Sequence, residues 1–588
     1  MLIRGGFGHP VALSLVIGPA SGAALGLVVG FVVGMGGAGP AHAQSISWLS
    51  PVSGTWNESA KWAGGSIPDA PGESAVLGLT GAYTVTQLLG TFTLDAITIT
   101  NPDATLELEG VTVNLLGAGL TNGGTVLLTG GTTTLDATFT NTTLGTFNID
   151  NADVLTLLAS GTNDGVIAIN PAAGGSITTL NFENPVTIDG IGQITLNAPS
   201  TRARITTSGA GSLTTGEAQT IRGEGSIGGV LHNHGLVLAD VVGGVLEIRI
   251  EPKTNFGIIR ASGGTIEITT DIAQDETGVI DAVGSLVRYN DATLAGGTIT
   301  SSGAGRHRVQ MTGSRFFNVD SFAHIEVRSG SSLRLGAEFT NFGTLDVNYA
   351  AGSSACRVWI DGPMTINGTG ELILRRSGTG AQLAEGPGGK LTLGPGQTLR
   401  GIGQIALPTT IEGTVAPGLS IGTLTVDDPS TTITWEPTST LDVELGSAAS
   451  FDKLSSGSHT INGGAIDVTI TGTYTPALFD TFTVIDGAAS SVVTGKFDAV
   501  NGPALPAPWV WKAGYTANDV IVGVTCPSDV NADFIVDIVD FLDFLDAFGS
   551  CENQPAPCGS VVDADYNGDT FVDILDFLDF FDAFGQGC

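Results

Sequence analysis

The sequence predicts a mainly β protein: a right-handed parallel β-helix (a solenoid), followed by a small α-helical C-terminal domain built on two twelve-residue loops. Three observations predict this fold class. Between about residues 75 and 425, short strands of alternating apolar and polar residues are separated by Asn-x-Gly corners. Segments within this region recur without gaps at one fixed offset in the numbering. Residues 526–588 contain one acidic motif written twice.

The composition suits several domains rich in strands and turns. The chain has 588 residues and 86 glycines, and its net charge is −35 although only 13% of residues are charged. Residues 526–588 include fourteen Asp and Glu side chains and no Lys or Arg, which leaves −21 for residues 1–525. A chain this acidic lacks the basic surface by which proteins bind nucleic acid.

Residues 1–43 are predicted to be a signal peptide. Arg4 precedes an apolar stretch from Val11 to Met35, and Ala41-His-Ala43 forms a small-x-small cleavage site. An uncleaved membrane anchor is the alternative, since the apolar stretch is long. No other segment could span a bilayer. We therefore expect a secreted or cell-surface protein without a membrane span in the mature chain.

Residues 44–80 are predicted to form an N-terminal cap. Trp56 and Trp62 precede the first regular strands, a pattern that resembles the opening of large surface passenger proteins, where it closes the end of the coil stack. The alternative is that the two indoles stack on a sugar.

Residues 81–412 are predicted to form the parallel β-helix. Asn122, Asn163, Asn233, Asn255 and Asn341 each begin an Asn-x-Gly corner before an apolar strand. Asn and Gly tolerate the left-handed backbone that a sharp corner needs. The step from Asn233 to Asn255 is 22 residues, about one turn of such a helix.

A longer repeat predicts that coils stack on one another. Residues 162–170 align without gaps to residues 340–348, and residues 185–194 align to 363–372 at the same offset of 178. We expect this offset to be a whole number of coils, such as eight coils of about 22 residues. Each coil needs its neighbours to bury its apolar side chains.

Residues 413–501 are predicted to be the terminal coils and a C-terminal β cap, and residues 502–525 the final strands and a Pro-rich linker. The succession of Leu441-Asp-Val-Glu-Leu, Phe451-Asp-Lys-Leu and Phe482-Thr-Val-Ile-Asp resembles the last coils and cap of autotransporter-like passenger β-helices, which belong to the pectin-lyase-like fold. In those proteins this segment blocks the exposed edge of the solenoid.

Parallel β-helices include pectin-degrading enzymes, so residues that resemble catalytic groups bear on the function. His232 and His234 lie on an Asn-x-Gly corner, and Trp359 and Asp361 resemble part of a pectate-lyase segment whose His is Gly362 here. Arginines that could bind a uronate are Arg202, Arg204, Arg375 and Arg376. None of these forms a complete catalytic motif, so we predict no catalytic residue.

The C-terminal motif has the spacing of a calcium-binding loop of the EF-hand type. Such a loop uses oxygen ligands at positions 1, 3, 5, 9 and 12 and a backbone carbonyl at position 7. The two loops start at Asp529 and Asp565. The predicted ligands are Asp529, Asn531, Asp533, Ile535, Asp537 and Asp540 in loop 1, and Asp565, Asn567, Asp569, Phe571, Asp573 and Asp576 in loop 2.

Each loop runs into a predicted helix. One apolar stripe comprises Ile538, Phe541, Leu542, Leu545 and Phe548, and the other Ile574, Phe577, Leu578, Phe581 and Phe584, with Asp543, Asp546, Asp579 and Asp582 on the opposite faces. A doubled loop–helix unit with Asp at position 12 resembles a dockerin domain. The Cys-Pro start and Gly-Cys end resemble the GC-type variant of exported planctomycete proteins. The resemblance implies two Ca²⁺ sites and a cohesin-like partner for residues 526–588.

Two features depart from the dockerin pattern. Loop position 6, usually Gly, is Phe534 and Thr570. A bulky residue in that backbone conformation costs about 1–3 kcal/mol, which predicts weaker calcium binding in loop 1. Positions 10 and 11, where the dockerin partner reads hydroxyl residues, are apolar here. The partner is accordingly a cohesin-like protein or another cell-surface receptor.

Four of the five cysteines lie in the C-terminal module, which fits disulfides in an oxidising compartment. Cys526, Cys551, Cys558 and Cys588 allow three pairings, of which we favour Cys526–Cys588 with Cys551–Cys558. Cys356 is expected to be a buried thiol.

The sequence thus predicts an exported, non-catalytic β-solenoid that binds or is anchored through a calcium-dependent dockerin-like domain. One alternative is a pectate-lyase-like enzyme of polysaccharide catabolism that its dockerin delivers to a polysaccharide. Another is a structural surface-layer or adhesive protein.

Overall fold

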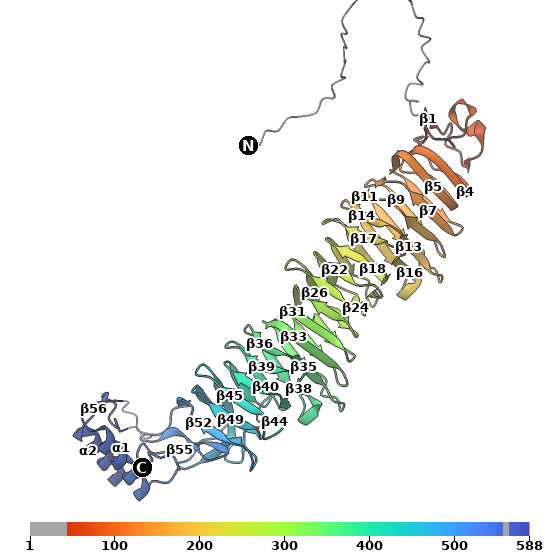
Figure 1. Cartoon of the computed structure of the whole chain (residues 1–588). Helices are drawn as coiled ribbons and strands as arrows, with labels where there is room; N and C mark the ends of the chain where they lie inside the picture. Colours follow the sequence, from red (N-terminus) through yellow and green to blue (C-terminus); the bar gives the residue numbers. More distant parts are fainter. Residues whose placement is uncertain (1–43, 557–563, 587–588) are drawn as a thin grey trace, which may run out of the picture. The chain divides into compact units, whose positions relative to one another are not determined.

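The computed structural model describes residues 44–556 and 564–586 (Figure 1). The predicted signal peptide and Cys558 and Cys588 lie outside these residues. From β1(Gln44–Ser47) to β53(Ala499–Asn501) the chain forms a parallel β-solenoid of about 18 turns, in which strands pair with the strands one coil before and one coil after them. Figure 1 shows these coils following one another in chain order.

The pairings sort the strands of the solenoid into three faces, which we call A, B and C in the order in which the chain visits them. Five strands turn a corner and contribute to more than one face: β4(Tyr83–Ile99), β5(Ala104–Asn122), β18(Thr220–Ile227), β31(Ser314–Phe322) and β33(Ser332–Asn341).

Face A holds the strands that precede the Asn corners of the first half of the body. Its other strands are β1(Gln44–Ser47), β3(Glu73–Leu77), β8(Phe139–Asn141), β11(Gly161–Asn163), β14(Pro185–Asp189), β17(Ser212–Thr215), β19(Leu231–Asn233), β22(Lys253–Asn255), β25(Ile272–Gln274), β28(Thr293–Ala295), β35(Arg357–Asp361), β38(Gln382–Glu385), β41(Gln404–Ala406), β44(Thr423–Val426), β48(Lys453–Ser455) and β51(Thr481–Asp486).

Face B holds the strands that follow those corners. They are β2(Gly54–Thr55), β6(Thr125–Thr129), β9(Thr146–Ile149), β12(Val166–Ile169), β15(Gln193–Asn197), β20(Leu236–Ala239), β23(Ile258–Ala261), β26(Val279–Val283), β29(Thr298–Ser302), β36(Pro363–Asn367), β39(Lys390–Leu393), β42(Thr409–Ile411), β45(Thr432–Trp435), β49(Ser458–Ile461) and β52(Val493–Gly495).

Face C completes each coil. Its strands are β7(Thr132–Asp136), β10(Val154–Leu157), β13(Thr178–Phe182), β16(Ala203–Thr207), β21(Val245–Ile248), β24(Thr265–Ile268), β27(Leu286–Tyr289), β30(Arg306–Val309), β32(His324–Val327), β34(Thr344–Val347), β37(Glu371–Leu374), β40(Thr398–Gly401), β43(Thr414–Pro417), β46(Thr440–Ser447), β50(Ala465–Ile470) and β53(Ala499–Asn501).

Alternation along each strand builds one continuous core. In β24, Ile266 and Ile268 are buried, while Thr265 and Glu267 face outward. Because the register between coils keeps inward residues above inward residues, apolar side chains from Ile46 to Val522 form a single cluster. No coil could bury this face alone, so the stack is stabilised as a unit.

Buried Asn side chains at the corner from face A to face B link successive coils. Asn122 donates to Asn141 (2.8 Å), and Asn141 donates to Asn163 (2.7 Å). Further along the chain, Asn233 donates to Asn255 (2.8 Å), its register partner one coil later. The step between these two residues is therefore one turn, as predicted. These hydrogen bonds between Asn side chains satisfy polar groups that are buried at the corner.

The long repeat is not a whole number of coils, contrary to our expectation. Starting from β12 on face B, eight coils lead to the end of β33 on the same face. The segment that matches β12, residues 344–347, is the next strand, β34, on face C. Asn341 accordingly lies at the corner from face B to face C. The second copy of the repeat therefore lies one face further along the coil. This shift is possible because strands on all three faces have the same alternation of inward apolar and outward polar side chains.

Both ends of the solenoid are closed. Trp48, Trp56 and Trp62 are at most 1% exposed and meet edge to face near the short helices η1(Ser59–Lys61) and η2(Ala63–Gly65). The indole N–H of Trp62 donates to the Trp56 carbonyl (2.7 Å). Because these rings are buried, they are not available to stack on a sugar.

At the other end, the parallel pairing stops and an antiparallel hairpin covers the last coil. β55(Asp519–Thr525) pairs antiparallel with β51 and with β54(Val510–Tyr515), which satisfies the open strand edge. The predicted Pro-rich linker precedes this hairpin, and Cys526 follows β55 directly. The remaining short elements of the body are η3(Ser200–Arg202), η4(Gly378–Gly380) and β47(Ser450–Phe451).

The C-terminal module consists of two helices and a two-stranded pairing. Its elements are α1(Ile538–Cys551), β56(Gln554–Pro555), β57(Phe571–Val572) and α2(Ile574–Gln586). Each helix begins at position 10 of its predicted twelve-residue loop, at Ile538 in loop 1 and Ile574 in loop 2. The sequence predicts a helix at this place in both copies.

Two histidines are buried inside the coils. The Nδ1 atom of His307 lies 2.9 Å from the Tyr289 hydroxyl, and its Nε2 lies 2.8 Å from the Thr300 carbonyl oxygen. The neutral ring fits both contacts by donating from Nε2 and accepting at Nδ1. Burial lowers the pKa values of His307 and His459 to about 4.

Acidification from pH 7 to pH 4 is expected to destabilise the wild-type protein more than the H307Q variant, by on the order of 3 kcal/mol. Between pH 6.5 and pH 4 the unfolded chain binds a proton at His307 that the folded chain does not, so stability falls as the pH falls through this window. The glutamine side chain of the variant retains a donor and an acceptor but does not titrate. Urea unfolding of both proteins at the two pH values measures the difference, and equal losses would contradict the prediction.

Candidate functional site

The two predicted calcium loops have the same backbone conformation. Loop position 4 is left-handed in both copies, with φ +57° at Ala532 and +73° at Gly568. Position 6 is left-handed as well, with φ +67° at Phe534 and +74° at Thr570. The sharp turn that the loop type requires is therefore present twice, although neither copy has Gly at position 6.

The position-1 and position-12 carboxylates organise both loops alike. Asp529 accepts backbone N–H bonds from loop positions 5 and 6 at 3.2 and 3.1 Å, and Asp565 accepts the equivalent bonds at 3.0 and 2.8 Å. At position 12, Asp540 accepts from the Asp537 N–H at 2.9 Å, and Asp576 accepts from the Asp573 N–H at 2.8 Å. The same bonds thus close both loops.

The other predicted ligands also lie within this pattern. At position 3, Asn531 and Asn567 each accept from the position-5 N–H (3.0 and 2.9 Å). At position 5, Asp533 and Asp569 accept from the N–H groups of Ile535 and Phe571, respectively (2.9 and 3.0 Å). At position 9, Asp537 and Asp573 accept from the second residue of the following helix, each at 2.7 Å.

Buried acid groups in the loops favour a bound cation. Asp529, Asp540 and Asp576 are fully buried. Burial raises the pKa of Asp540, and the neighbouring Asp529 and Asp533 carboxylates raise it further. Burying like charges together is costly unless a cation neutralises them, and carboxylate, amide and carbonyl oxygens are ligands that suit Ca²⁺.

The ligand sets themselves remain predictions. Within residues 44–556 and 564–586, no three His, Cys, Asp or Glu side chains gather closely enough to hold a metal ion. The loop carboxylates instead accept backbone N–H bonds. Carboxylate oxygens have lone pairs beyond those that one N–H bond uses, so these bonds are compatible with a cation.

The helices pack partly through predicted stripe residues, such as Phe541 against Phe584 (ring centroids 5.6 Å apart) and Phe548 against Phe577 (5.8 Å), and partly through residues outside the stripes. The rings of Phe544 and Phe580 stack with centroids 4.0 Å apart, and both side chains are fully buried. By contrast, Ile538, Leu542, Ile574, Leu578 and Phe581, which we assigned to the apolar stripes, are between 52% and 61% exposed. Only part of each predicted stripe therefore lies in the interface between the two helices.

Exposed apolar side chains recur at equivalent positions of the two loop–helix units. Positions 10 and 11 contribute Ile538 and Val539 from loop 1 and Ile574 and Leu575 from loop 2, all at least 44% exposed. We call this set, together with Leu542 and Leu578, the apolar docking face. Solvent-exposed apolar side chains grouped in this way are typical of protein-binding surfaces.

Cys526 and Cys551 are each disulfide-bonded, whereas Cys558 and Cys588 lie outside the described residues, so the pairing remains a prediction. Cys356 is a buried free thiol. Burial raises the pKa of the Cys356 thiol to about 12, which makes it a poor nucleophile.

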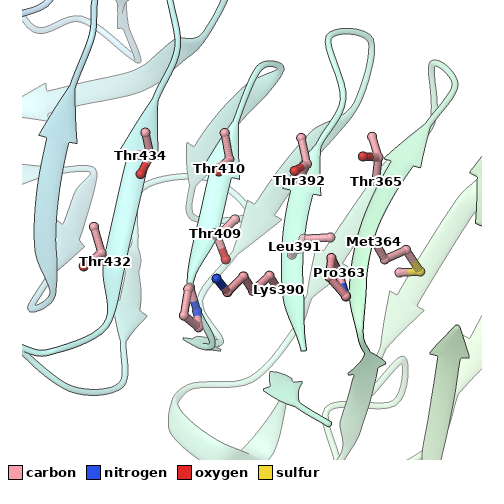
Figure 2. A pocket seen from close by; sticks show the side chains of 11 residues that line it. Pro363, Met364, Thr365, Lys390, Leu391, Thr392, Thr409, Thr410, Thr432 and Thr434 are labelled. Atoms are coloured by element: carbon pink, nitrogen blue, oxygen red, sulfur yellow. The ribbon is translucent and has the colours of Figure 1, made fainter. Parts of the chain in front are cut away.

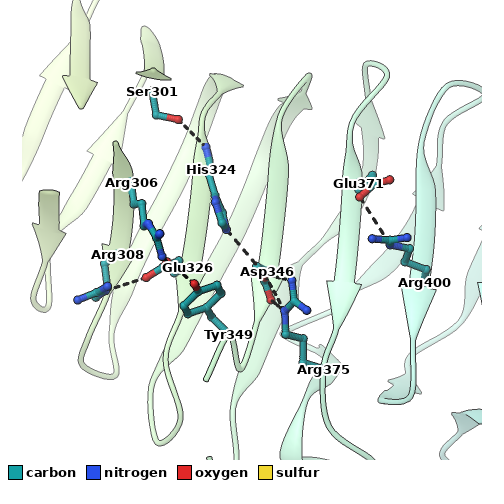
Figure 3. A network of polar contacts seen from close by, with 10 residues as sticks. All are labelled: Ser301, Arg306, Arg308, His324, Glu326, Asp346, Tyr349, Glu371, Arg375 and Arg400. Atoms are coloured by element: carbon teal, nitrogen blue, oxygen red, sulfur yellow. Dashed lines mark hydrogen bonds and ion pairs between the residues drawn. The ribbon is translucent and has the colours of Figure 1, made fainter. Parts of the chain in front are cut away.

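On the solenoid, two buried carboxylates that the sequence analysis missed lie in register on adjacent coils of face C. Glu326 in β32 pairs in register with Asp346 in β34, and both side chains are fully buried (Figure 3). Arg306 and Arg308 bind Glu326 at 2.6 and 2.8 Å. Arg375 binds Asp346 through its Nε and Nη2 atoms at 2.7–2.8 Å. Both carboxylates are therefore paired with guanidinium groups from neighbouring coils.

A second acid pair lies near the end of the solenoid. Asp442 in β46 is the register partner of Asp467 in β50. Burial raises the pKa of Asp442, and the Asp467 carboxylate raises it further. Two interacting carboxyl groups with one raised pKa are the kind of pair that glycan hydrolysis uses. This is the pair on which the polysaccharide-degrading alternative would rest.

The remaining candidate residues of the body make structural contacts. His232 Nδ1 lies 2.7 Å from the Thr254 hydroxyl, and the His234 ring stacks on Phe256 with centroids 4.6 Å apart. Arg334 lies over the Trp359 ring and forms an ion pair with Asp361. These contacts all join neighbouring coils.

Of the other candidate arginines, Arg202 lies in η3 and Arg204 donates to the Thr179 hydroxyl (2.9 Å). Arg376 donates to the Ala351 carbonyl (3.0 Å). Arg375 is committed to Asp346, as described above. Three of the four thus already have partners within the chain.

A shallow hollow of about 460 Å³ lies on face B (Figure 2). Thr365, Thr392, Thr410 and Thr434 lie along it in one register row on successive coils. Lys390 is the ionisable residue in its lining. Its surface offers hydroxyl and methyl groups, which suit binding better than acid–base chemistry.

Among the described residues, no helix is both long and apolar enough to cross a membrane. No protein-family model matches the chain, and no curated protein matches it in sequence. The fold and the two loops are therefore the basis for assigning a function.

Proposed function

We propose that this protein is an exported, non-catalytic β-solenoid that docks or is anchored through its calcium-dependent, dockerin-like C-terminal module. The observation that carries the proposal is the duplication of structure in the module: two acidic loops with matching hydrogen bonds, each followed by a helix with exposed apolar residues at the same positions. Calcium would be held by Asp529, Asn531, Asp533, Asp537 and Asp540 in loop 1 and by their equivalents in loop 2.

In this proposal, the chain's own residues present the docking face. Loop closure orders the start of each helix, because the position-9 and position-12 carboxylates cap it. The helices then hold the apolar docking face outward through the Phe544–Phe580 contact. A bound cation supplies the charge that lets the buried carboxylates lie together.

The charge of the module indicates the chemistry of the partner. Acidic side chains on the same helices include Asp543, Asp546, Asp579 and Asp582, and residues 526–588 include no Lys or Arg. A second copy of the module would bring like charges together. A partner with an apolar patch surrounded by Lys and Arg is complementary in both respects. A cohesin-like protein or a cell-surface receptor of this kind fits the surface.

Substitution of the docking face is expected to abolish capture of the partner. Full-length protein on beads should retain the partner from an extract of the producing cells in calcium and release it in EGTA. The L542D/L578D variant should lose capture, because it places charges in the apolar face without burying them. The S550D variant adds a charge at another exposed position of α1 and should still bind. Equal capture by L542D/L578D would contradict this role.

The polysaccharide-degrading alternative has its own test. A reducing-sugar and unsaturated-uronate assay on pectins and alginates should show no activity under the proposal. Activity that D442N or D467N removes would overturn the non-catalytic assignment.

A further inference from the structure

Loop 1 contacts the end of the solenoid through its position-6 residue. Phe534, at position 6 of loop 1, is only 9% exposed. Its ring lies against two glycines of the closing hairpin: a Cβ on Gly523 would come within 2.4 Å of it, and one on Gly514 within 3.0 Å. Thr570, the equivalent residue of loop 2, has nearly the same φ but is exposed.

This difference explains the unusual residue at position 6. Both loops adopt the left-handed conformation there, so the conformation itself does not call for an aromatic side chain. The aromatic ring fills a recess that Gly514 in β54 and Gly523 in β55 leave open. The bulky residue thus has a packing partner that offsets part of its backbone strain.

Polar contacts join the same hairpin to the first ligand position. The Thr525 hydroxyl donates to Asp529 Oδ2 at 2.6 Å, and the Phe534 N–H donates to the same oxygen at 3.1 Å. The Lys512 ammonium donates to the backbone carbonyls of Pro527 (3.1 Å) and Asp529. One carboxylate therefore orients the Phe534 backbone, contacts the hairpin and supplies a predicted calcium ligand.

We propose that loop 1 is a calcium-controlled latch, in which Phe534 holds the C-terminal module on the β54–β55 hairpin and calcium in loop 1 strengthens that attachment. The inference rests on the proposed calcium binding. Since Asp529 takes part in both events, each should favour the other by the same factor. Loop 2 would bind calcium without this coupling and leave its side of the module free for a partner.

Hydrogen exchange of the hairpin amides in the full-length protein tests the latch. In the wild type, EGTA is expected to accelerate exchange in β54 and β55 by roughly 5–150-fold relative to calcium. In F534A the hairpin amides should exchange at one rate in both conditions, because the apolar contact is lost. F534L keeps an apolar side chain and should retain part of the response. T570A, the matched change in loop 2, should behave as the wild type.

Counting bound calcium by native mass spectrometry on the same samples separates the two hypotheses. If no calcium binds, both the proposed function and the latch are wrong. If two ions bind and the wild-type hairpin does not respond, or if F534A responds as the wild type does, the latch alone is wrong. Should F534A fail to order α1 and α2 in calcium, F534L decides: a response smaller than the wild type's supports the latch, and a response equal to the wild type's overturns it.

Discussion

Removal of calcium is expected to unfold residues 526–588 and to leave the solenoid intact. The proposed ions neutralise the buried Asp529, Asp540 and Asp576 carboxylates, and without them the module has a very small apolar core, made mainly by Ala547, Cys551, Ala564 and Val572 together with the stacked Phe544 and Phe580. Small domains of this kind often depend on their metal ions for folding. The effect should therefore be complete loss of the ordered module.

Limited proteolysis followed by mass analysis measures this effect. In excess EGTA, cleavage should concentrate in residues 526–588, and the body should persist as one large fragment whose β circular dichroism is unchanged. Readdition of calcium should restore protection. A D540N/D576N variant, which replaces the position-12 carboxylate of each loop, should be cleaved in calcium as the wild type is in EGTA. Equal protection with and without calcium would contradict the calcium assignment.

The R375A variant is expected to lose about 3–5 kcal/mol of stability in the coils around β34 and β37. Arg375 supplies two guanidinium donors to Asp346, whose side chain is fully buried. Truncating the arginine leaves that carboxylate in the interior without its guanidinium partner, and the His324 ring, 3.7 Å away, does not replace the two lost donors (Figure 3). An unpaired buried charge is among the most destabilising changes that a single substitution produces.

The chain offers a matched control on the same face. Arg400 pairs with Glu371 at 3.6 Å, and both side chains are about 40% exposed, so R400A should cost at most about 1 kcal/mol. Urea unfolding and hydrogen exchange of β32, β34 and β37 report the difference. Adding D346N to R375A should recover part of the loss, because the amide is not charged. Similar costs for R375A and R400A would show that the buried pair is not the cause.

The sequence predicted the solenoid because its signals are local and repeated. Alternation within a strand specifies which side chains point inward, and Asn233 and Asn255 mark one turn because each occupies the same corner. The acidic loops could also be predicted from the sequence, since all the ligand positions of each loop lie within one short, continuous segment. In both cases neighbours in the structure are close, or evenly spaced, in the sequence.

Contacts between distant segments could not be predicted in this way. The long repeat did not reveal that its second copy is rotated by one face, because strands of all three faces carry the same alternation. Nothing in the sequence around Glu326 and Asp346 marks them as adjacent buried acids, since their partners come from coils before and after them. The predicted helix stripes included Leu542 and Leu578 and left out Phe544 and Phe580, yet packing exposes the two leucines and buries the two phenylalanines.

The sequence by itself determined the fold class, the length of a coil and the two acidic loops with their helices. Only the tertiary structure decided which residues the loops and helices bury. Phe534 is the clearest case: from the sequence it is a flaw in a calcium loop, and in the structure it fills a glycine-lined recess on the closing hairpin. The physical reason is that strain is a property of one residue, whereas the burial that offsets it depends on surfaces brought together by the completed fold.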